Sequence, residues 1–356
     1  NNTDGTCTAN ITNNLSNRNL IINGAMNIAQ RGTSSTSTSY QTVDRFRLAV
    51  ANADQAAYTQ KQVTDSPDDF SQSYEFDVTT AESALESNEY AFIGYRVEAQ
   101  DLQSVKANQV TLSFHVKAYQ TGTYAINIYQ QDGNIQITKT YTISQSATWE
   151  KKTLTFAANT GTQPNNDNGF GWEIAWIMAA GSGVTSSDST SWGGYADAGF
   201  AYGQVVNVLS STDNYFKITG VQLEVGSVAT DFEHLSYGDT LAKCQRYFYK
   251  EKSSQAYCVF CNLAAYTTGN GYGRVDFPVP MRTDGSGISL GYSAVGDFQA
   301  LGSGVQPTIT AFLISGRVSS TGGQLLAQTN AGYTVGNAYV LRSSTSNAFL
   351  TFDAEL

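Results

Sequence analysis

The stretch Phe216–Lys250, FKITGVQLEVGSVATDFEHLSYGDTLAKCQRYFYK, is where the character of the chain changes. Its first part, Lys217–Val225, alternates apolar and polar residues as a half-buried strand does. Gly226–Asp231 then breaks the alternation, and from Leu241 to Phe248 apolar residues recur at helical spacing. The stretch therefore predicts a strand and then a short helix, which together separate two parts of the chain.

Composition sets the broad class of the protein. The 356 residues include 41% hydrophobic and 12% aromatic residues, enough for a sizeable core, but only 14% are charged. Gly numbers 32 and Tyr 21, and low charge with such residues is typical of all-β extracellular or virion proteins. The net charge of −10 argues against nucleic-acid binding, which depends on clustered Lys and Arg. No apolar run approaches the roughly 20 residues that cross a bilayer, so we expect no membrane insertion.

The region before the opening stretch is rich in period-two alternation, which predicts strands. Thr121-Gly122 and Asp132-Gly133-Asn134 lie between alternating segments, as hairpin turns do. Eight or nine strands at this spacing predict an antiparallel jelly-roll β-sandwich, whose last strand, Phe216–Val225, returns beside the first, Asn19–Asn27. The other expected strands are Tyr74–Thr79, Tyr90–Val97, Val110–Ala118, Tyr124–Tyr129, Ile135–Ile143, Thr153–Ala157 and Phe170–Met178.

After Phe248 the chain is β-rich again. Its length of roughly one hundred residues suits a second, smaller C-terminal β-sandwich domain. The expected strands there are Ala256–Leu263, Gly273–Val279, Thr308–Ser315, Ala338–Leu341 and Ala348–Ala354. The predicted organisation of this all-β chain is an N-terminal connector (1–18), the jelly-roll β-sandwich domain (19–235), a helical linker (236–252) and the C-terminal β domain (253–356).

One interval, from Met178 to Gln204, is too long and too rich in glycine for a tight turn. Long loops on a rigid sandwich are usually functional or disordered, and aromatic residues favour an ordered loop. Because pyranose rings stack on aromatic side chains, we expect Trp192, Tyr195 and Tyr202 to bind glycan, with burial against a neighbouring subunit as the alternative. One continuous apolar strand face is expected in the core: Phe170, Trp172, Ile174, Trp176 and Met178.

We expect the protein not to be an enzyme. His115 and His234 lie in an alternating strand and in the opening stretch, and no nucleophile elbow, His-Glu-x-x-His helix or phosphate-binding glycine loop is present. Cys258 and Cys261 have CxxC spacing but no second ligand pair, so we expect two small core residues and not a zinc site. Paired carboxylates could hydrolyse a glycan, but we expect these acids to be solvated: Asp65, Asp68, Asp69, Glu173, Asp188 and Asp197.

Three motifs carry a resemblance to a known class of proteins. They are VQLEVGSVAT, FEH, SYG and CQRYFYK within the opening stretch, NRNLIINGAMNIAQRGTS with TVDRF near the start, and VDFPVPMR near Pro280. Together they resemble tail-fibre and structural proteins of tailed bacteriophages, especially marine and cyanobacterial ones. The motifs span most of the chain and occur in the order expected for that class.

The resemblance implies a virion component, on the tail or on the capsid surface. It implies a tail-fibre subunit that forms a homotrimer, attaches to other virion proteins through its N-terminal segment and contacts host-surface glycans as a receptor-binding protein. The alternative is a capsid or tail decoration protein with a purely structural role, and a glycan hydrolase is the third reading. Because the first residue is not Met, we expect the chain to begin inside a longer product.

The segment NLIINGAMN also resembles the first strand of carbohydrate-binding jelly rolls of the galactose-binding-like kind. That resemblance implies a structural calcium ion held by oxygens near Asn23, Gly24 and Glu224. Gly220 stands where those families often have an acidic residue, so the metal is left open. Glycan binding itself is expected to need no cofactor.

Overall fold

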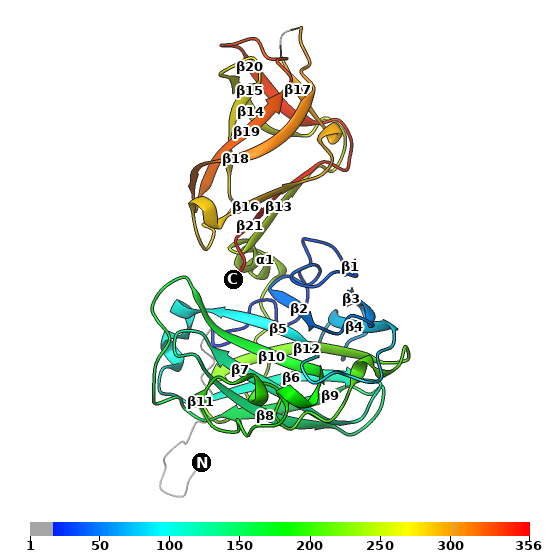
Figure 1. The fold of residues 1–356 in the computed structure, drawn as a ribbon. Helices are drawn as coiled ribbons and strands as arrows, with labels where there is room; N and C mark the ends of the chain where they lie inside the picture. Colours follow the sequence, from blue (N-terminus) through cyan, green and yellow to red (C-terminus); the bar gives the residue numbers. More distant parts are fainter. Residues whose placement is uncertain (1–16, 303) are drawn as a thin grey trace, which may run out of the picture. The chain divides into compact units, whose positions relative to one another are not determined.

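The computed structural model describes residues 17–302 and 304–356, so most of the expected connector lies outside the described residues. The chain forms two compact units built almost entirely from strands (Figure 1). The first contains residues 17–27 and 33–235, and the second contains Ile28–Gly32 and Ser236–Leu356. Residues 28–32, which the sequence predicts to belong to the sandwich domain, thus lie in the second unit. None of the helices in the described part combines the length and the apolar character that a membrane crossing requires.

The first unit is an antiparallel jelly-roll β-sandwich, as the sequence predicted. From β4 to β7, successive strands alternate between the two sheets, which makes the jelly roll. Sheet A has the order β1 (Ser34–Ser35), β3 (Ala57–Val63), β4 (Ser73–Thr80), β12 (Tyr215–Val225), β6 (Val110–Ala118) and β9 (Glu150–Phe156). Sheet B has the order β11 (Gly193–Gly194), β8 (Ile135–Ile143), β7 (Gly122–Gln130), β10 (Phe170–Ala180), β5 (Tyr90–Glu98) and β2 (Phe46–Ala51).

The core lies between sheets A and B and is rich in aromatic residues. Trp176 of β10 is fully buried and meets Phe114 of β6 edge to face, with 6.0 Å between ring centroids. Three other members of the predicted apolar face also belong to this core: Trp172, Ile174 and Met178. Phe170 does not, and the prediction for that residue was wrong.

The first expected strand does not form. Residues 19–27 are irregular, with a turn at residues 22–25, and Asn23 and Met26 have left-handed backbone angles, with φ of 61° and 59°. Two backbone hydrogen bonds still join this segment to β12, from Leu20 N to Leu223 O and from Val221 N to Gly24 O, each 2.9 Å long. The segment therefore lies beside the last strand without the regular pairing that the sequence predicted.

The turn at Thr121-Gly122 is not a hairpin. β6 belongs to sheet A and β7 to sheet B, so this connection crosses from one sheet to the other. The other expected hairpin is confirmed, because β7 and β8 pair directly on either side of residues 131–134. Strands β2 and β3 escaped prediction because their apolar residues are interrupted by Arg47, Gln60 and Lys61.

A β-bulge in β12 sets which residues of the opening stretch face the core. Thr219 pairs with His115 and Gln222 with Ser113, so β12 holds one extra residue between these pairs. Phe216 and Ile218 point into the core before the bulge, and Val221 and Leu223 do so after it. Without the extra residue one of these two apolar sets would turn to the outer face.

Gly220 makes the bulge possible. It has a φ of +60°, and a Cβ there would lie 2.5 Å from Phe70 Cζ and 2.8 Å from His115 Nδ1. Phe70 and His115 belong to an aromatic cluster on sheet A that also contains Phe232 and His234. A side chain at position 220 would therefore strain the backbone and displace this cluster.

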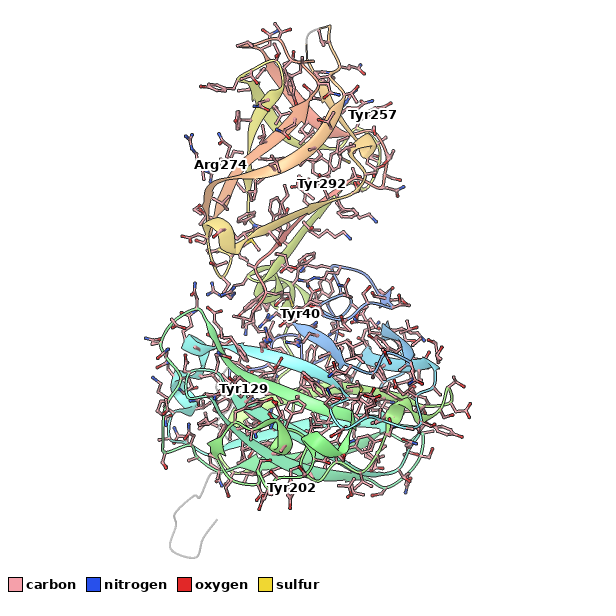
Figure 2. All side chains as sticks on the ribbon, viewed as in Figure 1. Tyr40, Tyr129, Tyr202, Tyr257, Arg274 and Tyr292 are labelled. Carbon is pink, nitrogen blue, oxygen red and sulfur yellow. The ribbon has the colours of Figure 1, made fainter. Side chains whose placement is uncertain are left out.

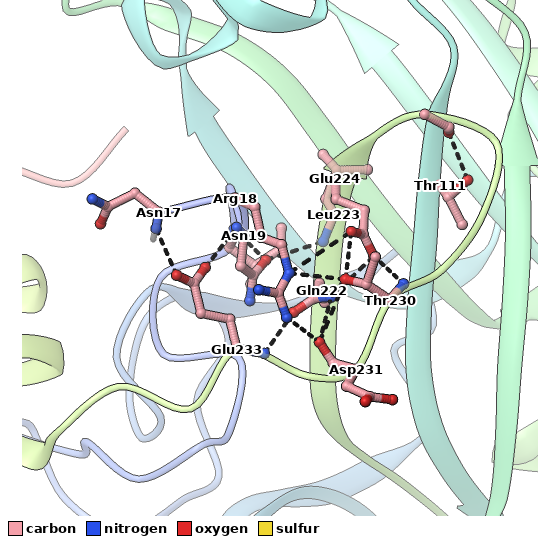
Figure 3. Close-up of polar contacts among 12 residues, drawn as sticks. Asn17, Arg18, Asn19, Thr111, Gln222, Leu223, Glu224, Thr230, Asp231 and Glu233 are labelled. Carbon is pink, nitrogen blue, oxygen red and sulfur yellow. Dashed lines mark hydrogen bonds and ion pairs between the residues drawn. The ribbon is translucent and has the colours of Figure 1, made fainter. Parts of the chain in front are cut away.

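The residues that follow β12 fold back onto the first described residues of the chain. Glu233 accepts hydrogen bonds from the backbone N–H groups of Asn17 and Asn19, at 2.5 and 2.9 Å (Figure 3). Gln222 Oε1 accepts from Glu233 N at 2.8 Å. Glu224 accepts from Thr230 N and Thr230 Oγ1, at 2.8 and 2.7 Å. Two of the three sequence motifs are thus held together within the sandwich.

The second unit contains the predicted short helix and a smaller set of strands. Helix α1 spans Tyr237–Gln245 and begins at Ser236, whose Oγ accepts from Asp239 N at 3.1 Å. One sheet has the order β13 (Phe248–Lys252), β21 (Phe349–Asp353) and β16 (Ser289–Tyr292). The other has the order β17 (Phe298–Leu301), β20 (Ala338–Ser343), β14 (Val259–Ala265), β15 (Asn270–Asp276), β19 (Gly322–Thr329) and β18 (Ile309–Ser319).

The segment Ile28–Gly32 packs on β13 and β21 within this unit. Gln30 Nε2 donates to Phe248 O at 2.8 Å, and the Arg31 guanidinium lies 3.6 Å from the centroid of the Phe248 ring. Arg31 also pairs with Asp353 at 2.9 Å. The second half of the NRNLIINGAMNIAQRGTS motif therefore contacts the CQRYFYK part of the opening stretch.

We expect Gly220→Ala to destabilise the sandwich by about 1–3 kcal/mol, because alanine disfavours the positive φ and its methyl group would contact Phe70. Gly194→Ala is the matched control, since nothing lies within 4 Å of a Cβ there. Chemical denaturation of both variants measures the difference. Equal stability of the two variants would contradict this role for Gly220.

A network of charges covers the outer face of sheet A. Asp65 accepts from Lys217 Nζ at 2.7 Å, from Lys117 Nζ at 3.0 Å and from Trp149 Nε1 at 3.1 Å. Lys217 also pairs with Glu75 at 2.6 Å. Partial burial alone would raise the pKa of Asp65, but the hydrogen bonds from Lys217, Lys117 and Trp149 outweigh it and lower the pKa to about 2.

We expect this network to give the sandwich an acid-dependent stability. Because the folded-state pKa of Asp65 lies below the unfolded value of about 3.9, its contribution is complete above about pH 4 and is lost as the pH falls to about 2. Asp65→Asn should therefore lower the melting temperature at pH 6 or so and have little effect near pH 2. A difference that stays constant over this range would contradict the assignment.

Candidate functional site

The outer face of sheet B carries two kinds of residue. On its central strands the side chains that point away from the core include Phe92, Ala125, Ala175 and Ile177, all of them buried. Phe200 and Ala201, from the irregular interval that follows β10, belong to the same buried cluster, in which the Phe200 ring meets that of Phe92. The long interval therefore serves as a cover for an apolar patch that the sandwich leaves outside its core.

Hydrogen bonds hold this cover in place. Thr138 Oγ1 of β8 donates to Gly199 O at 3.1 Å, and Gln136 Nε2 donates to Ala196 O at 2.8 Å. Gln204 Oε1 accepts from Ala125 N at 2.6 Å. The segment includes two short 3-10 turns, at Ser182–Val184 (η2) and Asp197–Gly199 (η3), and a third, Val208–Ser210 (η4), follows it. It is an ordered part of the fold, as its aromatic content predicted.

A groove of about 570 Å³ remains on the part of this face that the cover does not occupy. Its floor is formed by β2, β5 and β10, and the cover contributes Tyr195 and Phe200 to its wall. Gly94 lies on β5 between the groove residues Phe92 and Arg96, and a Cβ there would come within 2.9 Å of Phe92 and 3.1 Å of Arg47. A larger residue at position 94 would therefore push against the groove residues Phe92 and Arg47.

Aromatic side chains line the groove at both ends. At one end Tyr90 and Phe92 stack with ring centroids 6.0 Å apart, and Phe200 meets both rings. At the other end the ring centroids of Tyr129 and Tyr195 lie 5.0 Å apart. Arg96 pairs with Glu173 and Glu173 with Tyr129, so Tyr129 lies level with Arg96, four residues from Phe92 on β5. The two aromatic groups are therefore offset by about 13 Å along the strands.

Phe170 belongs to the second aromatic group because of another β-bulge. The register of β10 against β5 shifts between Phe170 and Trp172, so Phe170 leaves the core face on which Trp172 lies. Its ring lies 6.0 Å from Tyr129, and the Arg96 guanidinium lies 4.6 Å from its centroid. The bulge therefore turns a residue that the sequence placed in the core into a wall of the groove.

Charged groups occupy the middle of the groove. Glu173 Oε1 accepts from Arg96 Nε at 3.1 Å and pairs with Arg47 Nη1 at 3.0 Å. All three side chains are partly exposed, between 14% and 24%. The mutual pairing fixes their positions, so that donors and an acceptor face the groove in a defined arrangement.

The tyrosines of the groove act as neutral hydrogen-bonding groups. Burial, followed by the hydrogen bond to Asp197, raises the pKa of Tyr195, whose hydroxyl donates to Asp197 Oδ1 at 2.8 Å. Burial likewise raises the pKa of Tyr90 and of Tyr129. All three tyrosine hydroxyls therefore keep their protons at neutral pH.

The three residues expected to bind glycan lie in different places. Tyr195 lines the groove. Trp192 packs on the core at Trp172, with 5.7 Å between ring centroids, and its Nε1 donates to Ala157 O at 2.8 Å. Tyr202 lies in the turn after η3, apart from the groove residue Tyr129 (Figure 2). The structure thus brings Tyr195 together with residues that the sequence analysis did not select, namely Tyr90, Phe92, Tyr129 and Phe170.

The other sequence candidates are engaged in structural contacts. His115 and His234 contact Phe70, and burial, with Lys151 second, lowers the pKa of His115. Cys261 is buried in the second unit and Cys258 is partly exposed, both as free thiols. Near the calcium position implied by resemblance, the oxygens of Glu224 already accept from Gln222 and Thr230 (Figure 3).

A second hollow, of about 580 Å³, lies in the second unit. It is lined by strands β14, β15 and β19, with Tyr272, Arg274 and Gln324 among its residues. Tyr272 is the one aromatic residue among those that line this hollow. It therefore lacks the paired aromatic walls of the groove on sheet B.

Comparison with known proteins gives only distant structural similarities. No family model and no curated protein matches the sequence. The enzymatically active domain of a tailspike protein from bacteriophage CBA120 is 14% identical, with a TM-score of 0.34 over 59% of this chain and 22% of that one. A family 11 carbohydrate-binding module of a cellulosomal cellulase from Clostridium thermocellum is 12% identical, with a TM-score of 0.30 over 55% of this chain and 96% of the module. The chain thus spans about a fifth of the tailspike structure.

We expect Trp192→Ala to destabilise the sandwich by about 2 kcal/mol or more, because the variant loses packing on Trp172 and the hydrogen bond to Ala157. Thermal and chemical unfolding measure the loss. A variant as stable as the wild-type protein would show that the indole is not an anchor of the cover.

Proposed function

We propose that the groove on sheet B binds a glycan of the host surface and that the chain is a receptor-binding subunit of a tailed-phage fibre. The observation that carries the glycan part is the pairing of two aromatic walls with a fixed set of charged groups between them. Aromatic faces suit the apolar C–H faces of pyranose rings. Arginine and carboxylate groups suit the hydroxyls, which can both donate and accept hydrogen bonds.

The size of the groove supports an oligosaccharide in preference to a single sugar. The two aromatic groups are about 13 Å apart along the strands, so separate rings of one chain could stack on each. Such shallow sites bind weakly on their own. A homotrimer, as the phage resemblance implies, would strengthen attachment through avidity.

The proposal includes no bond-breaking step. Among the described residues that line the groove, Glu173 is the one carboxylic acid, and it is engaged by Arg47 and Arg96. Glycoside hydrolysis generally uses a pair of acidic residues on either side of the bond. The groove therefore favours binding over hydrolysis.

The test is binding of the full chain to an array of bacterial surface glycans, followed by titration with one soluble oligosaccharide. We expect Phe170→Ala and Tyr129→Ala each to weaken binding by about tenfold or more, because each removes a stacking surface. Tyr202→Ala is the matched control, since this tyrosine belongs to the same unit but not to the groove.

Two outcomes would overturn the proposal. If Arg274→Ala in the second hollow abolishes binding while the groove variants retain it, the groove is not the site. If the folded wild-type protein binds virions but no glycan and no host cell, a decoration protein with a structural role becomes the better account.

A further inference from the structure

Three carboxylates gather beside one end of the groove, outside the site described above. Asp54 lies in the turn between β2 and β3, Glu82 follows β4, and Glu89 precedes β5. One oxygen from each residue lies within 4.8 Å of the other two. Asp54 is exposed, whereas Glu82 and Glu89 are only 3% and 2% exposed.

Backbone groups fix one oxygen of each buried carboxylate. Glu82 Oε2 accepts from Ala56 N at 3.1 Å, and Glu89 Oε2 accepts from Glu86 N at 2.6 Å. The main chain of Glu82 is held as well: its N–H donates to Leu209 O at 2.7 Å, and its carbonyl oxygen accepts from Asn207 Nδ2 at 3.1 Å. Both side chains are therefore positioned before any ligand arrives.

The remaining oxygen of Glu82 is unsatisfied. Glu82 Oε1 is buried and has no hydrogen-bond partner within the described residues. No lysine or arginine of the described chain forms an ion pair with Asp54, Glu82 or Glu89. Burial, and then the charge of Glu89, raises the pKa of Glu82. Buried carboxylates in such close contact call for a positive charge between them.

We propose that Asp54, Glu82 and Glu89 form a binding site for Ca²⁺. All three ligands are hard oxygen donors, which suit Ca²⁺, Mg²⁺ or Mn²⁺ better than Zn²⁺, since zinc prefers nitrogen and sulfur ligands. Ca²⁺ accepts irregular sets of carboxylate, carbonyl and water oxygens, whereas Mg²⁺ demands a near-ideal octahedron and gives up its water reluctantly. A site formed by a turn and a loop, with one exposed member that leaves room for water, suits Ca²⁺.

The ion would fasten the edge of sheet B next to the groove. Tyr90, the residue after Glu89, pairs with Ala51, and both line the groove. Asp54 lies three residues after Ala51, in the turn that follows β2. Ca²⁺ would thus tie the β2–β3 turn to the β4–β5 loop and hold Tyr90 in place. This consequence for glycan binding rests on the proposed function, while Ca²⁺ binding itself does not.

The test uses the full chain stripped of metal with a chelator and then titrated with CaCl₂ in a calorimeter and in a thermal-shift assay. We expect saturable binding of one ion and a rise in melting temperature that grows with Ca²⁺ concentration. Glu82→Gln should weaken Ca²⁺ binding by at least about tenfold, because it removes the buried charge. Glu86→Gln, an exposed residue of the same loop, is the matched control and should bind as the wild-type protein does.

A second readout separates loss of the site from loss of the fold. Without Ca²⁺, Glu82→Gln should melt at the same temperature as the wild-type protein or higher, since it relieves repulsion from Glu89. The proposal is overturned if the wild-type protein shows no saturable Ca²⁺ binding, or if Glu82→Gln responds to Ca²⁺ as fully as the control. A melting shift by Mg²⁺ equal to that by Ca²⁺ would overturn the assignment of the ion. Loss of Ca²⁺ binding with retained glycan binding would leave the groove intact and remove only its link to the ion.

Discussion

The apolar patch on the outer face of sheet B is the constraint on which the functional part of the sandwich depends. A sheet in a sandwich buries one face in the core and normally leaves the other to water. Here Phe92, Ala125, Ala175 and Ile177 lie on the second face, so it must be covered. The segment after β10 covers part of it with Phe200 and Ala201. Where the cover stops, the same face becomes the floor of the groove.

This chain has few charged residues, and several of them are clustered. Only 14% of its residues are charged, yet several of them meet in small networks, such as Asp65 with Lys117 and Lys217 on sheet A. The Glu173 cluster in the groove is of the same kind, but its partners are arginines stacked near aromatic rings. The Glu82 cluster differs because it holds negative charge without a protein cation in the described chain. That contrast is the reason for proposing a bound cation at the Glu82 cluster.

Period-two alternation predicted most of the sandwich because each of those strands has one apolar face. β6 and β8 were predicted with the boundaries that the structure has. The same rule failed where a bulge changes the face, as at Phe170, and where turns replace a strand, as at residues 19–27. Neither a bulge nor a left-handed residue such as Asn23 leaves a clear mark in the sequence.

The candidate site was predictable in part. The long glycine-rich interval, which no tight turn could accommodate, contains Tyr195, and this residue lines the groove. Trp192 could not be assigned, since an aromatic residue in a loop can face either a ligand or the core. A signal for the missed residues did exist: Tyr90, Phe92, Gly94 and Arg96 alternate along β5 with the core residues Ala91, Ile93 and Tyr95. When a strand has aromatic residues on both faces, its outer face is expected to be covered by another segment or to bind a ligand.

The most direct measurement is a crystal structure of the full chain with an oligosaccharide that it binds in solution. The account predicts sugar rings over sheet B, stacked on the Tyr129 and Phe170 side and on the Tyr90 side, with hydroxyls bonded to Arg47, Arg96 or Glu173. Sugar bound on the second unit beside Arg274, with the groove on sheet B left to water, would contradict it.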